Sequence, residues 1–167
     1  LEMREVLEAI VANPNGVDAS SLKEIQRYTK LFWINTGPYN NLTAQKFVLA
    51  ITPEALAAAA KTAASAGATF PLANGETLDQ LLARLKPMFF AADFEPSVTV
   101  KTPEKGFDIL TASHNNLYQG VSLKDLTGFK EKYGLNSRLV KQNGKLVEQV
   151  YKAGGLYDAQ LKEINTH

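Results

Sequence analysis

The sequence predicts an α+β fold in which a helix-rich first half is followed by short strands, a β-hairpin and flanking helices. Apolar residues recur at helical spacing through the first half of the chain. The second half contains short alternating segments, which are typical of strands. There, Asn143-Gly144 separates two such segments, and this dipeptide favours a hairpin turn because both turn positions need a positive φ. A chain of 167 residues can build these elements into a single domain or into a fragment of a larger one.

Residues 1–92 are expected to be mainly helical. The apolar face of the first helix consists of Met3, Val6, Leu7, Ile10 and Val11, and the turn residues Asn13-Pro14-Asn15-Gly16 end that helix. Ser21 and Glu24 predict a capping box at the start of the second helix. The apolar face of this helix consists of Leu22, Ile25, Thr29, Phe32 and Trp33, so we expect both aromatic rings to be largely buried.

Two further helices complete the first half. Thr52, followed by Pro53 and Glu54, has the residue order preferred at a helix start, and the helix is expected to end just before Gly67. Thr77 and Gln80 form a second capping box, and the helix that they begin is expected to end at Pro87.

Residues 97–151 are expected to mix strands with one helix. Residues 97–101 alternate like a strand, residues 102–106 form a turn, and residues 107–110 are a candidate return strand. Ser122 is expected to cap a helix that ends at Gly134 and turns Leu123, Leu126, Phe129 and Tyr133 inward. The Asn143-Gly144 hairpin spans residues 138–150, and a terminal helix covers residues 156–165.

The composition limits the classes of function. The chain is 45% hydrophobic and 21% charged, as is typical of soluble globular proteins. Its formal net charge of +1 leaves no basic surface to neutralise phosphates, so we expect no nucleic-acid partner. No segment approaches the roughly 18 consecutive apolar residues of a membrane span, and the first residues lack a signal-peptide core. We therefore expect a soluble protein without a membrane partner, and both a cytoplasmic and a periplasmic location stay open.

The chain is poor in residues for metal or nucleophilic chemistry. Cysteine is absent, which excludes thiolate nucleophiles and cysteine-ligated metals. A zinc peptidase needs two histidines one helical turn apart, whereas the two histidines here are His114 and the terminal His167. The sequence also lacks a nucleophile elbow, a phosphate loop and a dinucleotide fingerprint. We expect no catalytic residue, no metal site and no cofactor in this chain.

Two segments combine aromatic residues with asparagines, namely Leu31–Asn41 and Ser113–Gly120. Asparagine amides and tyrosine hydroxyls are neutral donors and acceptors that suit a peptide backbone. The competing interpretation is that Phe32 and Trp33 belong to the core and that the asparagines only form turns.

At these two segments the chain resembles the dipeptidyl peptidase III family of zinc metallopeptidases. The first matching block is Asn35-x-Gly37-x-Tyr39 followed by Lys46-Phe47-Val48. The second block runs from Tyr118 to Lys141 and includes Gly120, Ser122-x-x-Asp125, Asn136-Ser137-Arg138-Leu139 and Lys141. The order of the blocks and the leucine-rich helix between them also agree, so the resemblance extends over residues 27–151.

The chain also departs from the family. Asn41-Leu42-Thr43-Ala44 stands where many members have Ser-Phe-Gly-Asp, and the family's zinc-binding helices are absent. The resemblance therefore implies an N-terminal portion of a longer protein, from the lower lobe with its β-barrel core. The zinc-bearing upper lobe of the same polypeptide would be its partner, and zinc would be the cofactor of the full-length parent only.

The resemblance also implies a role in substrate binding. It suggests a noncatalytic wall of a peptide-binding cleft, in a protein that releases dipeptides from peptide N-termini. Asn35, Tyr39, Asn116 and Tyr118 are its candidate substrate-binding residues. The alternative is a stand-alone binding or interaction module without peptidase activity.

Overall fold

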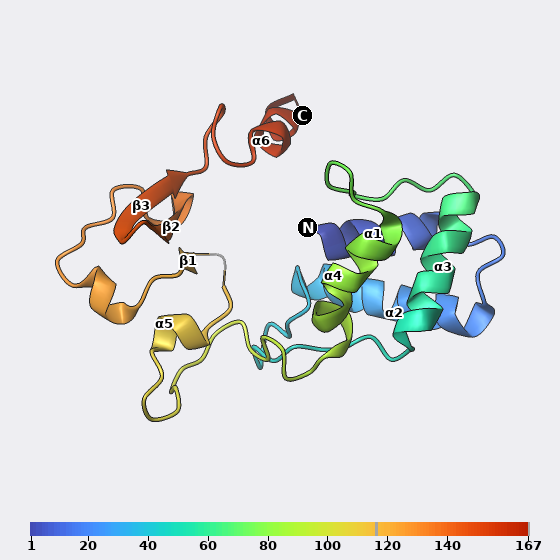
Figure 1. Ribbon diagram of the computed structural model, residues 1–167, viewed down its shortest axis with the longest axis horizontal. Coiled ribbons are helices and arrows are strands. Elements are labelled where there is room, and N and C mark those ends of the chain that lie inside the picture. The colour runs from blue at the N-terminus through green and yellow to red at the C-terminus, as the bar shows by residue number, and fades with distance from the viewer. Residues whose placement is uncertain (116, 167) are drawn as a thin grey trace. The chain divides into compact units, whose positions relative to one another are not determined.

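The computed structural model describes residues 1–115 and 117–166 and has the α+β fold that the sequence predicts, with helices first (Figure 1). The chain divides into two compact units, Leu1–Ser97 and Val98–His167. No helix in the described part of the chain is both long and apolar enough to cross a bilayer.

The first unit is built from four helices, which are α1 (Glu2–Ala12), α2 (Ala19–Asn35), α3 (Pro53–Ser65) and α4 (Leu78–Phe90). Helix α1 packs against α2 and α3, and α3 packs against α4 (Figure 1). Their apolar faces form one core, which has Val6, Leu7, Ile10, Ile25, Tyr28, Leu81 and Phe89 among its fully buried side chains. The predicted apolar face of the first helix is confirmed.

Helix α2 begins three residues earlier than a Ser21 cap predicts. Asp18 is the N-terminal cap, and its carboxylate accepts hydrogen bonds from the backbone N–H (2.8 Å) and the hydroxyl (2.9 Å) of Ser21. The Ser21–Glu24 capping box is therefore wrong, because a charged acceptor is available in the preceding turn. The Glu24 carboxylate binds Arg27 instead and accepts a hydrogen bond from the N–H of Ala50.

The caps of α3 and α4 are confirmed, but the predicted end of α4 is wrong. Thr52 accepts a hydrogen bond from Ala55, and the Thr77–Gln80 capping box is formed. Helix α4 continues through Pro87 to Phe90. Pro87 cannot donate to the carbonyl of the residue four positions earlier, Ala83, but that residue is exposed. The extra turn also brings Phe89 into the core with no exposed surface, which offsets the lost hydrogen bond.

The second unit contains a three-stranded sheet. Its strands are β1 (Tyr118–Gln119), β2 (Ser137–Gln142) and β3 (Lys145–Val150), in the order β1-β2-β3. Strand β1 is parallel to β2, and β3 is antiparallel to it, with Gln142 opposite Lys145. The turn residues Asn143 and Gly144 have φ values of 51° and 76°, so the predicted hairpin is confirmed.

The second unit also contains helical elements. They are α5 (Ile109–Ala112), the 3₁₀ turns η1 (Leu123–Leu126) and η2 (Gly134–Asn136), and α6 (Asp158–Thr166). Helix α6 lies where the terminal helix was predicted.

The predicted hairpin over residues 97–110 is wrong. Ser97 forms an isolated bridge with Gln45 instead of belonging to a strand, and the expected return strand overlaps α5. Asp108 explains the difference, since its carboxylate accepts hydrogen bonds from the backbone N–H groups of Leu110 and Thr111 and thereby starts a helical turn.

The predicted helix from Ser122 to Gly134 is also wrong. Ser122 and Asp125 do form a capping box, but the helical segment ends at Leu126. Gly128 has a φ of +78°, which interrupts a right-handed helix. Two side chains that were expected to point inward, Leu123 and Tyr133, are consequently more than half exposed.

Candidate functional site

Asn35, the first candidate residue, lies at the end of α2 and holds the loop that follows. Its side-chain amide donates to the carbonyl of Leu31 (2.9 Å), and its side-chain oxygen accepts from the N–H of Asn41 (3.0 Å). Thr36 then takes a left-handed conformation with a φ of 56°. The asparagine therefore uses both ends of its amide group within its own loop, although one amide hydrogen remains for a further acceptor.

Tyr39 lies in the same loop and is partly buried. Its hydroxyl donates to the backbone carbonyl of Glu95 (3.1 Å), and its backbone forms a bridge with Lys46. Burial raises the pKa of the Tyr39 phenol to about 12, and the nearby Glu95 carboxylate acts in the same direction. The phenol thus stays protonated at neutral pH and can donate a hydrogen bond, but it cannot act as a general base there.

Lys46 joins the loop to the end of α4. Its ammonium donates to the carbonyls of Pro87 and Phe94 and lies 5.3 Å from the centre of the Phe94 ring. Burial lowers the pKa of Lys46, while the carboxylates of Glu95 and Asp93 oppose that shift. Lys46 therefore serves as a positively charged cap on the carbonyl end of a helix, where the helix dipole favours a cation.

Tyr118 lies in strand β1 beside a small cup in the second unit. The cup has a volume of about 130 Å³ and is lined by Leu117, Tyr118, Glu131, Gly134, Leu135, Ser137 and Leu139. The Tyr118 hydroxyl donates to the Glu131 carboxylate (3.2 Å). Partial burial raises the pKa of Tyr118, and the negative charge of Glu131 raises it further.

The cup combines apolar walls with polar groups at one side. Leu117 and Leu135 are exposed apolar side chains, whereas Leu139 is buried. The Ser137 hydroxyl donates to the carbonyl of Gly134 (3.3 Å). A cavity of this size can hold one side chain of a peptide, with a phenol and a carboxylate in reach of polar atoms.

The fourth candidate, Asn116, lies outside the described residues. Asn35 and Tyr39 belong to the first unit and Tyr118 to the second, and each site is described within its own unit. That the two loops converge on one groove stays a prediction.

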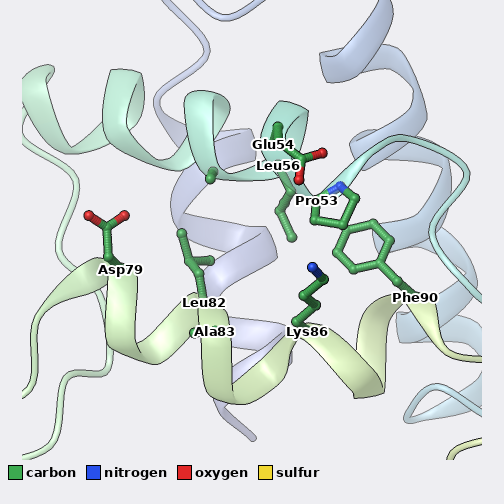
Figure 2. Close-up of a pocket in the computed structure, with 9 residues that line it drawn as sticks. Pro53, Glu54, Leu56, Asp79, Leu82, Ala83, Lys86 and Phe90 are labelled. Carbon is green, nitrogen blue, oxygen red and sulfur yellow. The ribbon is translucent and has the colours of Figure 1, made fainter.

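A second cavity, between α3 and α4, lies in the first unit (Figure 2). Its volume is about 190 Å³, and its walls are Pro53, Glu54, Leu56, Ala57, Asp79, Leu82, Ala83, Lys86 and Phe90. Lys86 extends from α4 into the cavity, beside Pro53 and Phe90 (Figure 2). Asp79, at the other end, pairs with Lys61 at 2.8 Å. The arrangement is a groove with apolar walls, one lysine and the carboxylates of Glu54 and Asp79, and no serine, threonine or cysteine lines it.

Residues 1–115 and 117–166 contain no group of three or more histidine, aspartate or glutamate side chains that could hold a metal ion. No protein-family model matches the chain. A search of curated proteins also found no significant relative.

Glu131 and both cavities were not predicted from the sequence. Glu131 lies between Lys130 and Lys132, in a pattern typical of a solvated surface. Its place in the cup depends on the early end of η1 and on the pairing of Tyr118 with Leu139. The groove between α3 and α4 is lined by one alanine from each helix, Ala57 and Ala83, and alanine at such positions is equally typical of any well-packed helix.

Proposed function

We propose that this chain is the noncatalytic, substrate-side portion of a dipeptidyl peptidase III-like zinc metallopeptidase. The parent protein would release dipeptides from peptide N-termini, with zinc bound by a lobe that this chain does not include. In this proposal the chain supplies contacts to the peptide and no group that reacts.

The cup beside Tyr118 is the observation that carries the proposal. It brings a neutral hydroxyl, a carboxylate and three leucines together at one edge of the sheet. Such a mixture can hold a peptide side chain through apolar contact and orient it through one or two hydrogen bonds.

Contacts among the residues that carry the family resemblance support the same proposal. Tyr118 pairs with Leu139 across β1 and β2. The Lys141 ammonium binds the Asp125 carboxylate at 2.7 Å, and Asp125 in turn accepts from the hydroxyl of Ser122 (2.8 Å). The second block is thus one connected structure beside the cup, which is what a common fold for this block requires.

The test uses the full-length parent enzyme with two variants of the cup, Tyr118→Phe and Leu135→Ala. Each removes a contact that the substrate and the transition state would share, so KM should rise by about threefold to tenfold while kcat stays unchanged. Tyr133→Phe is the matched control, because Tyr133 is an exposed tyrosine of the same unit that does not line the cup. An unchanged KM in both cup variants would contradict the proposal.

The second candidate function is a stand-alone binding module without peptidase activity. It is favoured by the position of the cup within one unit, which lets the cup bind a peptide without any zinc lobe. One sequence motif distinguishes the two candidate functions. The peptidase requires a His-Glu-x-x-x-His helix in the same polypeptide, and the binding module lacks it.

A further inference from the structure

Three asparagines of this chain are each followed directly by glycine. The pairs are Asn15-Gly16, Asn74-Gly75 and Asn143-Gly144, and all three asparagines are exposed. An asparagine before glycine is chemically labile, because the glycine has no side chain to keep its backbone nitrogen away from the asparagine amide. The three pairs are identical in sequence, but their turns in the structure differ.

The reaction open to such a pair is deamidation through a cyclic imide. The backbone nitrogen of the glycine attacks the side-chain carbonyl carbon, Cγ, of the asparagine, so that an N–Cγ bond forms and the Cγ–Nδ2 bond breaks. The side-chain nitrogen leaves as ammonia and takes with it the proton that the glycine nitrogen loses. Water then opens the ring at one of its two carbonyls, which gives aspartate or isoaspartate. No oxidant or reductant takes part.

Ring closure requires the glycine nitrogen to eclipse the asparagine Cβ. For an L-residue this alignment corresponds to a ψ of about −120°, which lies outside both allowed regions at negative φ. At positive φ, the same ψ belongs to the first central residue of a type II′ turn, a position that asparagine tolerates. An asparagine whose φ is already positive is therefore closer to the reacting geometry than one whose φ is negative.

Asn143 is the one of these three asparagines that has a positive φ. Its φ of 51° and the Gly144 φ of 76°, between the paired residues Gln142 and Lys145, are typical of a type I′ turn. A flip of the peptide unit between Asn143 and Gly144 converts this turn into type II′, and both types fit a two-residue hairpin. Among the described residues, no hydrogen bond holds the Asn143 side chain or the Gly144 N–H in place.

The asparagines of the first two pairs lie in turns of another kind. The N–H of Val17 donates to the carbonyl of Pro14 (3.1 Å) and closes the first turn. The N–H of Glu76 donates to the carbonyl of Ala73 (2.9 Å) and closes the second. In both turns the glycine has a positive φ and the asparagine does not, which is typical of type II. These two asparagines must therefore change the sign of φ before the ring can close.

We propose that Asn143 is a site of spontaneous deamidation, which forms isoaspartate in the turn between β2 and β3. Isoaspartate continues the main chain through its side-chain carbon and so adds one backbone atom to a turn that fits two residues. The pairing of β2 with β3 weakens as a result, and β2 carries Ser137 and Leu139 of the cup. This inference goes beyond the proposed function and does not depend on it.

Peptide mapping by mass spectrometry measures the conversion of each asparagine while the 167-residue chain is kept at mildly alkaline pH. The same measurement in concentrated urea gives the rates without any turn, so the ratio of the folded rate to the urea rate corrects for flanking residues. This ratio should exceed one for Asn143. It should be at least about fivefold lower for Asn15 and Asn74, because these two must first reach a positive φ. A smaller difference, or a ratio below one for Asn143, overturns the inference.

The Val147→Pro variant separates a reaction within the turn from a reaction after local unfolding. The closing pair Gln142–Lys145 of a two-residue hairpin is hydrogen-bonded, and because such pairs alternate, the Val147 N–H donates to Val140. Proline at this position removes the bond and disrupts the hairpin. The conversion of Asn143 should slow in the variant, whereas the asparagines of the first unit should keep their rates. A faster or unchanged conversion of Asn143 overturns the inference, because this asparagine then reacts from an open chain.

Discussion

Phe32 and Trp33 are neighbours in α2 but have different surroundings. Phe32 is 6% exposed and contacts the Tyr28 ring, whereas Trp33 is 49% exposed and donates its indole N–H to Glu8 (2.8 Å). The sequence-based expectation that both rings are buried is thus confirmed for Phe32 and wrong for Trp33. The helical face that points to the core contains Ile25, Thr29 and Phe32, and position 33 lies about 100° further round the helix.

This difference predicts unequal costs of truncation. Phe32→Ala should lower the free energy of unfolding by about 3–5 kcal/mol, because it leaves a cavity in the core of the first unit. Trp33→Ala should cost much less, since it removes a half-exposed ring and one exposed hydrogen bond. Urea unfolding of both variants, followed by circular dichroism, checks the order. Equal costs would contradict the burial described for these rings.

Asp125, in the second unit, accepts hydrogen bonds from three donors. The Lys141 ammonium, together with the N–H and hydroxyl of Ser122, holds the pKa of Asp125 well below its usual range. A lowered folded-state pKa stabilises the fold above the unfolded-state pKa, and this stabilisation is lost as pH falls towards the folded-state value.

The Lys141→Met variant should therefore raise the pKa of Asp125. The increase should be partial, because both donors of Ser122 remain. Lys130→Met is the control, as it removes an exposed lysine of the same unit that makes no ion pair with Asp125. Carboxyl chemical shifts followed over a pH titration measure the pKa of Asp125 in both variants. An unchanged pKa of Asp125 in Lys141→Met would exclude the ammonium as the main cause of the lowered pKa.

Among the elements, the hairpin of β2 and β3 depends most directly on its turn. Gly144 has a φ of +76°, and a Cβ added there would meet no neighbouring atom within 4 Å. Gly144→Val should therefore destabilise the hairpin through backbone strain alone, by about 1 kcal/mol or more. Gly144→Asn should cost less, since asparagine tolerates this region. Amide hydrogen exchange of the hairpin residues compares the two variants, and equal exchange rates would argue against strain as the cause.

Elements whose signals are local could be predicted from the sequence, and elements that depend on competing local bonds could not. The caps at Thr52 and Thr77 and the Asn143-Gly144 turn are complete within a few residues. The prediction of a hairpin at residues 97–110 was wrong because the side chain of Asp108 starts a helical turn there. Likewise, the helical segment that begins after Ser122 ends at Leu126, because Thr127 is extended and Gly128 has a positive φ, although the apolar spacing continues past them.

In the candidate site, too, some residues could be predicted from the sequence and others could not. Tyr118 was singled out from its polar-aromatic loop, and it does lie beside a cavity. Glu131 lies 13 positions further along the chain and reaches Tyr118 only through the fold of the second unit. Asn35 was singled out for its amide, which the structure uses mainly to hold its own loop. Sequence patterns identify residues capable of a contact, and packing decides which partner each one meets.

At the scale of the whole molecule, apolar burial is distributed unequally between the two units. The contiguous core of buried side chains lies entirely within residues 3–89, on α1 to α4 and the segment that contains Leu49. The buried apolar side chains of residues 98–166, apart from the undescribed position 116, are Val121, Leu139 and Val140. Cooperative stability comes mainly from such burial, so the two units should differ in their ability to fold alone.

Separate expression of residues 1–97 and 98–167 tests this difference. The first fragment should be helical and unfold in one cooperative transition, because all its helices share one core. The second fragment should unfold without a sharp transition, and it should bind a dye that reports exposed apolar surface. Its hairpin turn favours the native register, but an isolated two-stranded hairpin is at best marginally stable in water, and β1 adds only two residues. A sharp transition in the second fragment would contradict the expected difference between the two units.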